Sequence, residues 1–302
     1  MMRSLYSGIS GLKNHQTRMD VIGNNIANVN TTGYKASRVI FQDIFSQTVS
    51  SGMANTGVSR GTNPIQIGLG IRLSTVDVLH TWAPYGRTDN AFDMMIEGDG
   101  FFIVQGAEGN FYTRAGNFYL DNEGYLVTSD GMYVMGYTGT FTVEPGDPDA
   151  DPPIPPIVEF NDDIEMGTLS RIRLKAEDIG GAGTDVDLYG FNVADDGSIS
   201  VMIDNVKVSI AKVAVALFAN YGGLEKAGNN LYRATSSSGA ALDGPAMENG
   251  AGTIRGGGLE MSNVDLSTEF TDMIVTQRGF QANSRIITVS DTMLEELVNL
   301  KR

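Results

Sequence analysis

The hydrophobic pattern of the chain changes period twice, and this limits the folds open to it more than any other feature. Residues 1 to about 30 and 262 to 302 space their apolar residues three or four apart, as amphipathic helices do. The middle has short apolar runs separated by turn signals such as Gly-Asp-Gly and Asn-Glu-Gly, as β-strands do. Since both ends share one pattern, the chain must leave a helical region and return to it. We therefore predict an α+β fold with paired, antiparallel, coiled-coil-like terminal helices around a central β-rich domain.

The N-terminal pattern is an imperfect heptad with members at Leu5, Ile9, Leu12, Met19 and Ile26. Gly33 is the predicted helix stop. Four asparagines between residues 19 and 35 oppose helix formation, because asparagine has a low helix propensity. A helix pair with asparagine and glycine in its seam is marginal alone. We expect both ends to become ordered chiefly against neighbouring copies of the chain.

The C-terminal pattern predicts one helix of about 35 to 40 residues. Ser262 and Asp265 form a capping-box pattern, and no proline follows before Arg302. The apolar stripe consists of Ile286, Val289, Met293, Leu297 and Leu300, joined by Phe270, Met273, Ile274, Phe280 and Ile287.

These patterns predict three regions. Residues 1–31 and 266–302 form the terminal helical domain, residues 32–79 and 248–265 are connecting segments, and residues 80–247 form the β-rich domain. Six of the nine prolines lie between Pro145 and Pro156, which predicts an extended, acidic surface loop within an insertion at about 138–189.

Composition excludes several classes of function. The net charge of −15 argues against nucleic acid or an anionic membrane as the main partner. The absence of cysteine excludes disulfides and thiolate chemistry. The longest apolar run, Val213 to Ala219, is far too short to span a membrane, and the first thirty residues lack the features of a cleaved signal peptide.

Candidate catalytic and metal-binding motifs are weak. The sequence GVSRG at 57–61 matches a nucleophile motif but lies in a glycine-rich connector without a histidine partner. His15 and His80 are isolated, and packing or surface roles are far commoner for such residues. DPDAD at 147–151 opens like a calcium loop, yet Pro152 and Val158 occupy positions that need glycine and a carboxylate. We predict no enzyme activity, no cofactor and no metal.

Three stretches carry a family resemblance. SLYSGISGLKNHQTRMDVIGNNIANVNTTGYK resembles the N-terminal signature of bacterial flagellar rod and hook proteins. GDGFFIV followed by FYTRAGNFYLDNEGYLV is similar to the β-domain motif of that family, and SNVDLSTEFTDMIVTQRGFQANSRIITVSDTMLEELVNLKR resembles its C-terminal region. Together they cover about half of the chain, in the family's order.

The resemblance implies a helical homopolymer. The terminal helices would line the inner tube of a hollow filament, the connecting segments would form the next layer, and the β-domain would face outward. Export would proceed through the flagellar type III apparatus without a cleaved signal peptide, and the location would be the extracellular hook and basal body. Implied partners are further copies of the chain, the distal rod protein, the hook cap and the hook–filament junction protein.

Within the family, ANSRIITVSDTMLEELVNLKR and MGYTG resemble hook proteins more than rod proteins. A hook would act as a universal joint that transmits motor torque to the filament. The stretch Ser50 to Pro64 resembles an insertion of the distal rod protein, a stiff drive shaft, although some hooks share it. The other alternative is a secreted β-rich adhesin or hydrolase that oligomerises through helical ends.

The predicted subunit-assembly interface combines apolar seam residues with the N-terminal asparagines. Its members are Leu5, Ile9, Leu12, Met19, Ile22, Asn24, Asn25, Ile26, Asn28, Phe270, Met273, Phe280, Ile286, Val289, Met293, Leu297 and Leu300.

Overall fold

The structure, a computed structural model, describes residues 2–53, 61–138, 141–144, 157–160, 169–174, 191–203 and 206–300. The chain divides into two compact units. We name Met1–Val29, Lys35–Leu79 and Val264–Arg302 the helical unit, and Asn30–Tyr34 with His80–Asn263 the β unit. A helix at each end of a β-rich middle confirms the predicted α+β class. The proline-rich stretch 145–156, the DPDAD motif and most of GVSRG lie outside the described residues.

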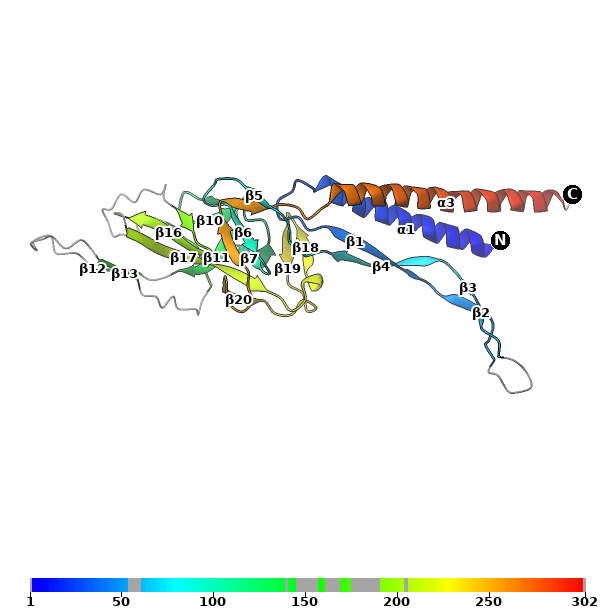
Figure 1. Cartoon of the computed structure of the whole chain (residues 1–302), viewed down its shortest axis with the longest axis horizontal. Coiled ribbons are helices and arrows are strands. Elements are labelled where there is room, and N and C mark those ends of the chain that lie inside the picture. The colour runs from blue at the N-terminus through cyan, green and yellow to red at the C-terminus, as the bar shows by residue number, and fades with distance from the viewer. Residues whose placement is uncertain are drawn as a thin grey trace, which may run out of the picture. The chain divides into compact units, whose positions relative to one another are not determined.

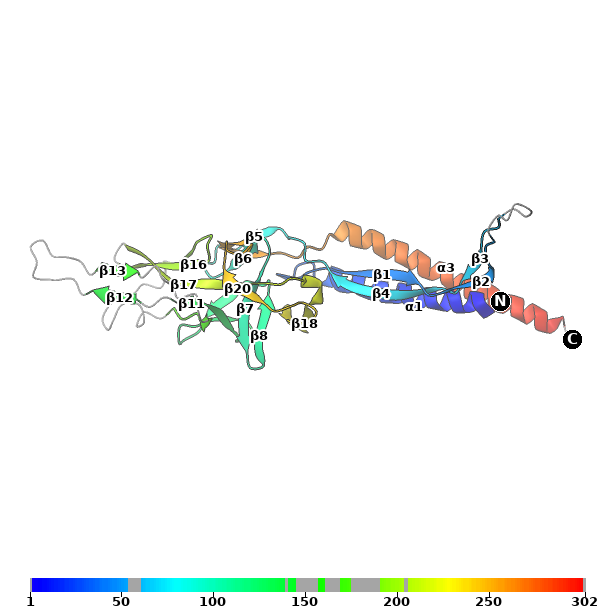
Figure 2. The same cartoon turned by 90° about the horizontal axis from the view of Figure 1, so that it is seen from below.

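The helical unit consists of two helices and a two-part β-ribbon (Figure 1). Its elements are α1 (Met2–Ala27), β1 (Ser37–Asp43), β2 (Ser46–Ser50), β3 (Ile65–Gly68), β4 (Ile71–Val78) and α3 (Leu266–Asn299). β1 pairs with β4, and β2 with β3, both antiparallel. The two helices lie side by side in opposite directions, with the ribbon of β1 and β4 along α1 (Figure 2). No described helix has the length and apolar character that crossing a membrane requires.

The C-terminal end of α1 and the N-terminal end of α3 both differ from the predicted end and start of these helices. α1 ends at Ala27, where the Asn28 side chain donates a 2.9 Å hydrogen bond to the Asn24 carbonyl oxygen. The predicted stop, Gly33, lies further along in the β unit, where its φ of +67° and a 2.8 Å hydrogen bond from its N–H to the Glu260 carbonyl oxygen place it in a turn.

The predicted capping box at the start of α3 is also wrong. Asp265 itself is the N-cap, and its carboxylate accepts a 2.9 Å hydrogen bond from the backbone N–H of Ser267. Ser262 is buried before the helix begins. A carboxylate at the N-cap satisfies a free N–H directly, so the serine was not needed for this role.

The β unit is built around an antiparallel sheet of 12 strands among the described residues. Its central order is β15-β16-β17-β11-β7-β8-β19-β18. The strands of the unit are β5 (Tyr85–Arg87), β6 (Met94–Glu97), β7 (Phe101–Gly106), β8 (Gly109–Thr113), β9 (Phe118–Leu120), β10 (Leu126–Thr128), β11 (Tyr133–Thr138), β12 (Phe141–Glu144), β13 (Ile157–Phe160), β14 (Ser170–Arg171), β15 (Asn192–Val193), β16 (Ser198–Ile203), β17 (Val206–Leu217), β18 (Glu225–Gly228), β19 (Leu231–Arg233), β20 (Leu242–Pro245), β21 (Thr253–Gly256) and β22 (Gly258–Glu260).

This sheet is buried on both faces. Along β7, Phe102 and Val104 belong to one hydrophobic core, while Phe101 and Ile103 belong to another. The same alternation divides β17, where Val213 packs in the first core with Phe102. Since successive side chains of a strand point to opposite faces, two cores on one sheet explain why its central strands are continuously apolar.

The segments predicted as connectors contain strands. Residues 32–79 supply the ribbon of the helical unit, and residues 248–265 supply β21 and β22. β21 pairs with β6 and β22 pairs with β5, so this C-terminal segment belongs to the β unit as far as Asn263.

The packing of the sheet predicts that substitutions of two glycines will differ in their effect on stability. A Cβ at Gly136 of β11 would lie 2.3 Å from the Lys212 carbonyl oxygen of β17, whereas one at Gly244 of β20 would meet nothing closer than 3.6 Å. We expect Gly136→Ala to lower the free energy of unfolding by about 1–3 kcal/mol. Gly244→Ala should change it by less than about 0.5 kcal/mol. Chemical denaturation of both variants checks this, and equal stabilities would contradict the packing described for β11.

Candidate assembly interface

The seam between α1 and α3 is formed by glycines that admit side chains from the opposite helix. A Cβ at Gly11 would lie 2.8 Å from the Asn283 amide nitrogen, and a Cβ at Gly8 would lie 3.4 Å from Ile287. In the other direction, a Cβ at Gly279 would lie 2.8 Å from the His15 ring. Glycine therefore allows the two helices to approach closely.

Polar contacts complete this seam. Arg18 pairs with Asp272 at 2.9 Å, and the Asn25 amide nitrogen donates a 2.9 Å hydrogen bond to a Glu269 carboxylate oxygen. The ion pair is partly exposed, so it contributes little to stability and mainly fixes the register of the helices. The partners run in opposite order along the two helices, which makes the pair antiparallel.

Asparagines of α1 bind the ribbon beside it. The Asn25 side chain accepts a 3.0 Å hydrogen bond from the Ser37 N–H and donates one of 2.9 Å to the Ser37 carbonyl oxygen. Asn14 donates a 2.8 Å hydrogen bond to the Ile71 carbonyl oxygen. An amide carries both donors and an acceptor, so it can satisfy the backbone at a ribbon edge as no apolar side chain can. The low helix propensity of these residues is thus offset by tertiary contacts.

Burial shifts the pKa values of two ionisable groups in the seam. It lowers the pKa of the His15 imidazole, to which Arg18 adds, and it raises the pKa of the Glu269 carboxyl despite the hydrogen bond from Asn25. The Nδ1 atom of His15 is buried without a hydrogen-bond partner among the described residues. His15 is thus a neutral packing residue, with its ring edge toward Phe41 at 6.2 Å between centroids.

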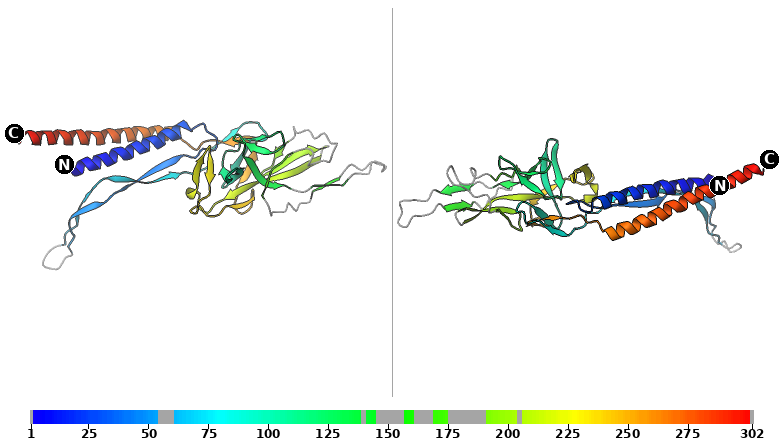
Figure 3. Two further views of the ribbon diagram at one scale, coloured as in Figure 1. Left: turned by 180° about the vertical axis from the view of Figure 1, so that it is seen from behind. Right: turned by 90° about the horizontal axis from the view of Figure 1, so that it is seen from above.

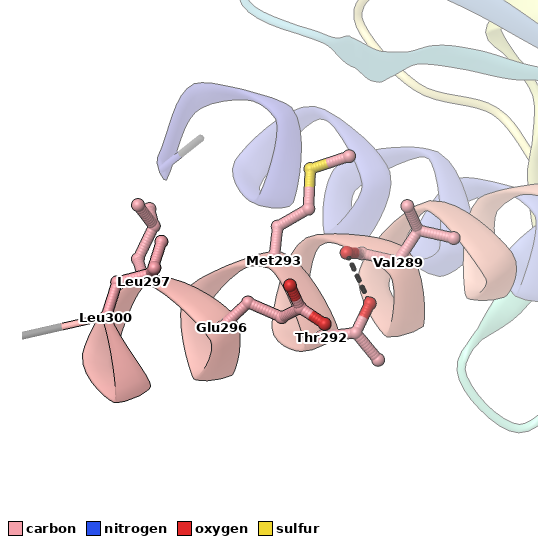
Figure 4. Close-up of a pocket in the computed structure, with 6 residues that line it drawn as sticks. All are labelled: Val289, Thr292, Met293, Glu296, Leu297 and Leu300. Atoms are coloured by element: carbon pink, nitrogen blue, oxygen red, sulfur yellow. Dashed lines mark hydrogen bonds between the residues drawn. The ribbon is translucent and has the colours of Figure 1, made fainter. Parts of the chain in front are cut away.

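The C-terminal half of α3 exposes an apolar surface. We name Ile286, Val289, Met293, Leu297 and Leu300 the α3 stripe; between 44% and 80% of each residue is exposed. Val289, Met293, Leu297 and Leu300 line a hollow of 540 Å³ with Thr292 and Glu296. Figure 4 shows Val289, Met293 and Leu297 directed to one side of the helix. In both views of Figure 3, the last turns of α3 extend beyond the first turn of α1. Ile286 borders α1, since a Cβ at Gly8 would lie 3.7 Å from its Cγ2 atom, whereas the described part of the chain leaves at least half of Val289, Met293, Leu297 and Leu300 exposed.

The predicted interface residues fall into three groups, which are exposed, partly buried or buried in the structure. The α3 stripe, Phe270, Ile9 and Asn24 are exposed. Leu5, Leu12, Met19, Ile26, Asn28, Met273 and Phe280 are partly buried. Ile22 and Asn25 are buried inside the helical unit, so they support the surface from beneath rather than present a side chain to a partner.

Sequence reasoning missed the glycine seam. Its α1 positions are Gly8, Gly11, His15, Arg18, Ile22 and Asn25, which repeat at alternating spacings of three and four. A search for apolar heptads passes over this face, although a search for small residues at the same spacing would find it.

Other candidate chemistry finds no support at the described positions. The His80 ring packs among Phe101, Tyr221 and Tyr232, with ring centroids 5.6 to 6.0 Å away. Across the residues that the structure describes, no group of three or more His, Asp or Glu side chains could hold a metal ion.

The seam predicts opposite outcomes for two substitutions in one helix. Gly11 is buried against Asn283, while a Cβ at Gly23 of α1 would meet nothing within 4 Å. We expect Gly11→Leu to separate α1 from α3 and to lower the free energy of unfolding of the helical unit by about 1–3 kcal/mol. Gly23→Leu should raise helix stability slightly, because leucine is a better helix former. Thermal melting followed by circular dichroism measures both. A Gly11→Leu variant as stable as Gly23→Leu would disprove the close approach.

Comparison with known proteins gives three family matches in chain order. Residues 5–35 match the flagella basal body rod protein family, residues 95–201 the flagellar hook protein FlgE/F/G D1 domain, and residues 255–300 the flagellar basal body rod FlgEFG protein C-terminal family. The first and last of these include most of α1 and α3.

Similar proteins match along the whole chain. The flagellar basal-body rod protein FlgG of Bacillus subtilis is 45% identical over 304 residues, covering 100% of both chains. Two proteins of Borreliella burgdorferi, the hook protein FlgE and the rod protein FlgG, are each 32% identical, over 443 and 308 residues, again covering 100% of both chains. This chain therefore belongs to the family of flagellar rod and hook proteins.

Proposed function

We propose that the chain is the hook subunit of a bacterial flagellum, and that it polymerises through its terminal helices into a hollow tube. As a family member it is a structural flagellar subunit. The observation that carries the proposal of polymerisation is the α3 stripe, a continuous apolar surface that the subunit leaves exposed. Burying five such side chains against neighbouring copies would remove a large apolar area from water, which is the main driving force of protein association.

The intramolecular seam leaves the apolar residues available for this assembly. Because Gly8, Gly11 and Gly279 bring α1 and α3 together, the partly buried heptad Leu5, Leu12, Met19 and Ile26 lies beside the seam rather than filling it. We propose that these residues and the α3 stripe pack in a coiled-coil-like manner against helices of neighbouring subunits. Such contacts would add the order that we expect an isolated subunit to lack.

Hook and rod proteins of one organism resemble this chain to the same degree. The Borreliella burgdorferi hook protein and rod protein are each 32% identical to it. The hook alignment is longer than this chain of 302 residues, so that hook protein contains segments without a counterpart here.

The distal rod is the second candidate. The 45% identity to Bacillus subtilis FlgG over almost equal lengths favours it, and so does the predicted insertion Ser50–Pro64. In the structure this insertion begins at the end of β2 and includes an isolated bridge between Met53 and Thr62. A rod subunit would transmit torque as a stiff shaft, whereas a hook subunit would allow its neighbours to slide during each rotation.

The proposal includes the partners and the location of a hook subunit. Neighbours would be further copies of the chain, with the distal rod protein at one end and the hook cap or hook–filament junction protein at the other. Export would use the flagellar type III apparatus and deliver the chain to the cell exterior.

Polymerisation should depend on the α3 stripe. We expect Val289→Asp with Met293→Asp to abolish polymers, because each buried apolar side chain is worth about 1.5–3 kcal/mol and the new carboxylates would lose water. The matched control, Gln281→Asp with Thr288→Asp, places the same charge on exposed positions of α3 away from the stripe. Electron microscopy scores the polymers, and circular dichroism of the monomers verifies folding. Normal tubes from the Val289 and Met293 variant would overturn the proposal.

The shape of the polymers separates hook from rod. We expect tubes assembled from the purified chain to be curved and supercoiled, because a universal joint requires subunits that change spacing around the circumference. Negative-stain imaging of many tubes at several ionic strengths measures the curvature. Uniformly straight tubes would assign the chain to the rod instead.

A further inference from the structure

We propose that His15 makes the helical unit a pH-sensitive switch, because protonation of its imidazole opens the contact between α1 and α3. The switch lies within one copy of the chain and can be tested on the subunit alone. Its consequence for assembly rests on the proposed function, since polymers need both terminal helices in place. Mild acid would then prevent polymers from forming.

The His15 ring occupies space that a glycine of the opposite helix leaves open. A Cβ at Gly279 of α3 would lie 2.8 Å from the Cε1 and Nε2 atoms of the ring and 3.3 Å from its Nδ1 atom. The ring also meets Phe41 of β1 edge to face, with 6.2 Å between the ring centroids. The imidazole of α1 is thus packed against both α3 and the ribbon. A change in its charge acts where these elements meet.

The enclosed nitrogen of this ring suits the neutral imidazole. Nδ1 is buried, and no described residue provides a hydrogen-bond partner for it. In a neutral ring this nitrogen can be the unprotonated one, so that no buried N–H lacks an acceptor. Protonation turns both ring nitrogens into donors and adds a positive charge, and a buried charge without a partner is costly. Separation of α1 from α3 would relieve this cost by admitting water to Nδ1.

The charged groups around His15 do not compensate the added proton. Burial lowers the pKa of His15, and the positive charge of Arg18, one turn further along α1, lowers it further. On α3, the Asp272 carboxylate is already bonded to Arg18 at 2.9 Å, and Glu269 accepts a hydrogen bond from Asn25. The pKa of His15 is not shifted by the other charged side chains on the nearby turns and strands, which are Lys13, Asp20, Arg278, Arg285, Arg38, Asp43, Arg72 and Asp77.

Acid affects the ionisable groups of the helical unit in different directions. Because the pKa of folded His15 lies below the ordinary 6.5, the unfolded state binds this proton first as the pH falls. Stability is therefore lost from about pH 6.5 downward, until the folded-state pKa is reached. Burial raises the pKa of Glu269, so acid adds stability through that group. Hydrogen bonds from Thr268 and Ser267 lower the pKa of the N-cap Asp265 below 3.8, so its effect is lost only in stronger acid.

Circular dichroism at about 222 nm follows the switch in the full chain, because α1 and α3 are the α-helices of the part that the structure describes. Denaturant unfolding is measured from about pH 7.5 to about pH 5. We expect the unfolding equilibrium constant of the helical signal to rise by up to about tenfold per pH unit below pH 6.5, since unfolding takes up one proton.

Two variants assign this pH dependence. His15→Phe keeps a planar ring between the helices and removes the titrating group, so its helical stability should not fall on acidification. The matched control, His80→Phe, changes the other histidine of the chain, which lies in the β unit, and should keep the full loss. The same acid loss in His15→Phe as in the unmodified chain would overturn the inference.

Nuclear magnetic resonance of the unmodified chain decides the matter if His15→Phe does not fold. With two histidines in the sequence, the His80→Phe variant assigns both imidazole signals. We expect His15 to titrate below 6.5, and the amide signal of Gly279 on the opposite helix to change with the same midpoint. A His15 that titrates at or above 6.5, or that titrates without a change at Gly279, would disprove the switch.

Polymers give the functional readout. Acid reduces the net charge of −15 and with it the repulsion between copies, which by itself favours polymers. We expect tubes formed at about pH 7.5 to dissociate at about pH 5.5, whereas tubes of His15→Phe persist. Unmodified tubes that persist equally at the lower pH would contradict the inference. If neither protein forms tubes at the higher pH, the proposed polymerisation fails, and the unfolding and resonance measurements alone decide on the switch.

Discussion

The close approach of α1 and α3 through glycine is the constraint on which the helical unit depends. With no side chain at Gly8, Gly11 and Gly279, the ring of His15 and the amide of Asn283 fit between the helices. Ile287 of α3 lies in this contact, whereas Val289, Met293, Leu297 and Leu300 stay at least half exposed. A subunit with a seam of larger apolar residues would bury its assembly surface within itself. In the proposed polymer, the glycines would thus leave apolar side chains of α3 available for contacts between subunits.

The β unit, in contrast, buries the apolar side chains of its central strands within itself. Its central strands are buried on both faces, and Phe101 and Phe102 point into different cores from adjacent positions. The apolar side chains of these strands are therefore removed from water within a single copy of the chain. The division of labour follows from side-chain placement. The β unit carries its own core, and the helical unit leaves part of its apolar surface exposed.

Periodicity predicted where helices and strands lie, but not which face of a helix is used. Leu5, Leu12, Met19 and Ile26 form the most apolar line on α1, yet glycines beside that line form the contact with α3. A hydrophobicity pattern identifies residues whose burial stabilises the fold. Close packing of two helices depends instead on positions without a side chain, which such a pattern does not identify. The buried amide of Asn25 was counted as an interface residue for a similar reason, since its hydrogen bonds to Ser37 are set by tertiary structure. Local rules also placed the N-cap at Ser262, although the carboxylate of Asp265 satisfies the helix directly.

Charge sets a second condition on assembly. Each chain carries a net charge of −15, and a polymer brings many copies within a Debye length of roughly 8–10 Å. Apolar contacts must overcome this repulsion unless opposite charges are placed face to face. Oppositely charged groups placed face to face would turn part of this repulsion into attraction. In the proposed polymer, burial of the exposed apolar side chains of the α3 stripe would have to outweigh this repulsion, so assembly should become easier as added salt screens the charges.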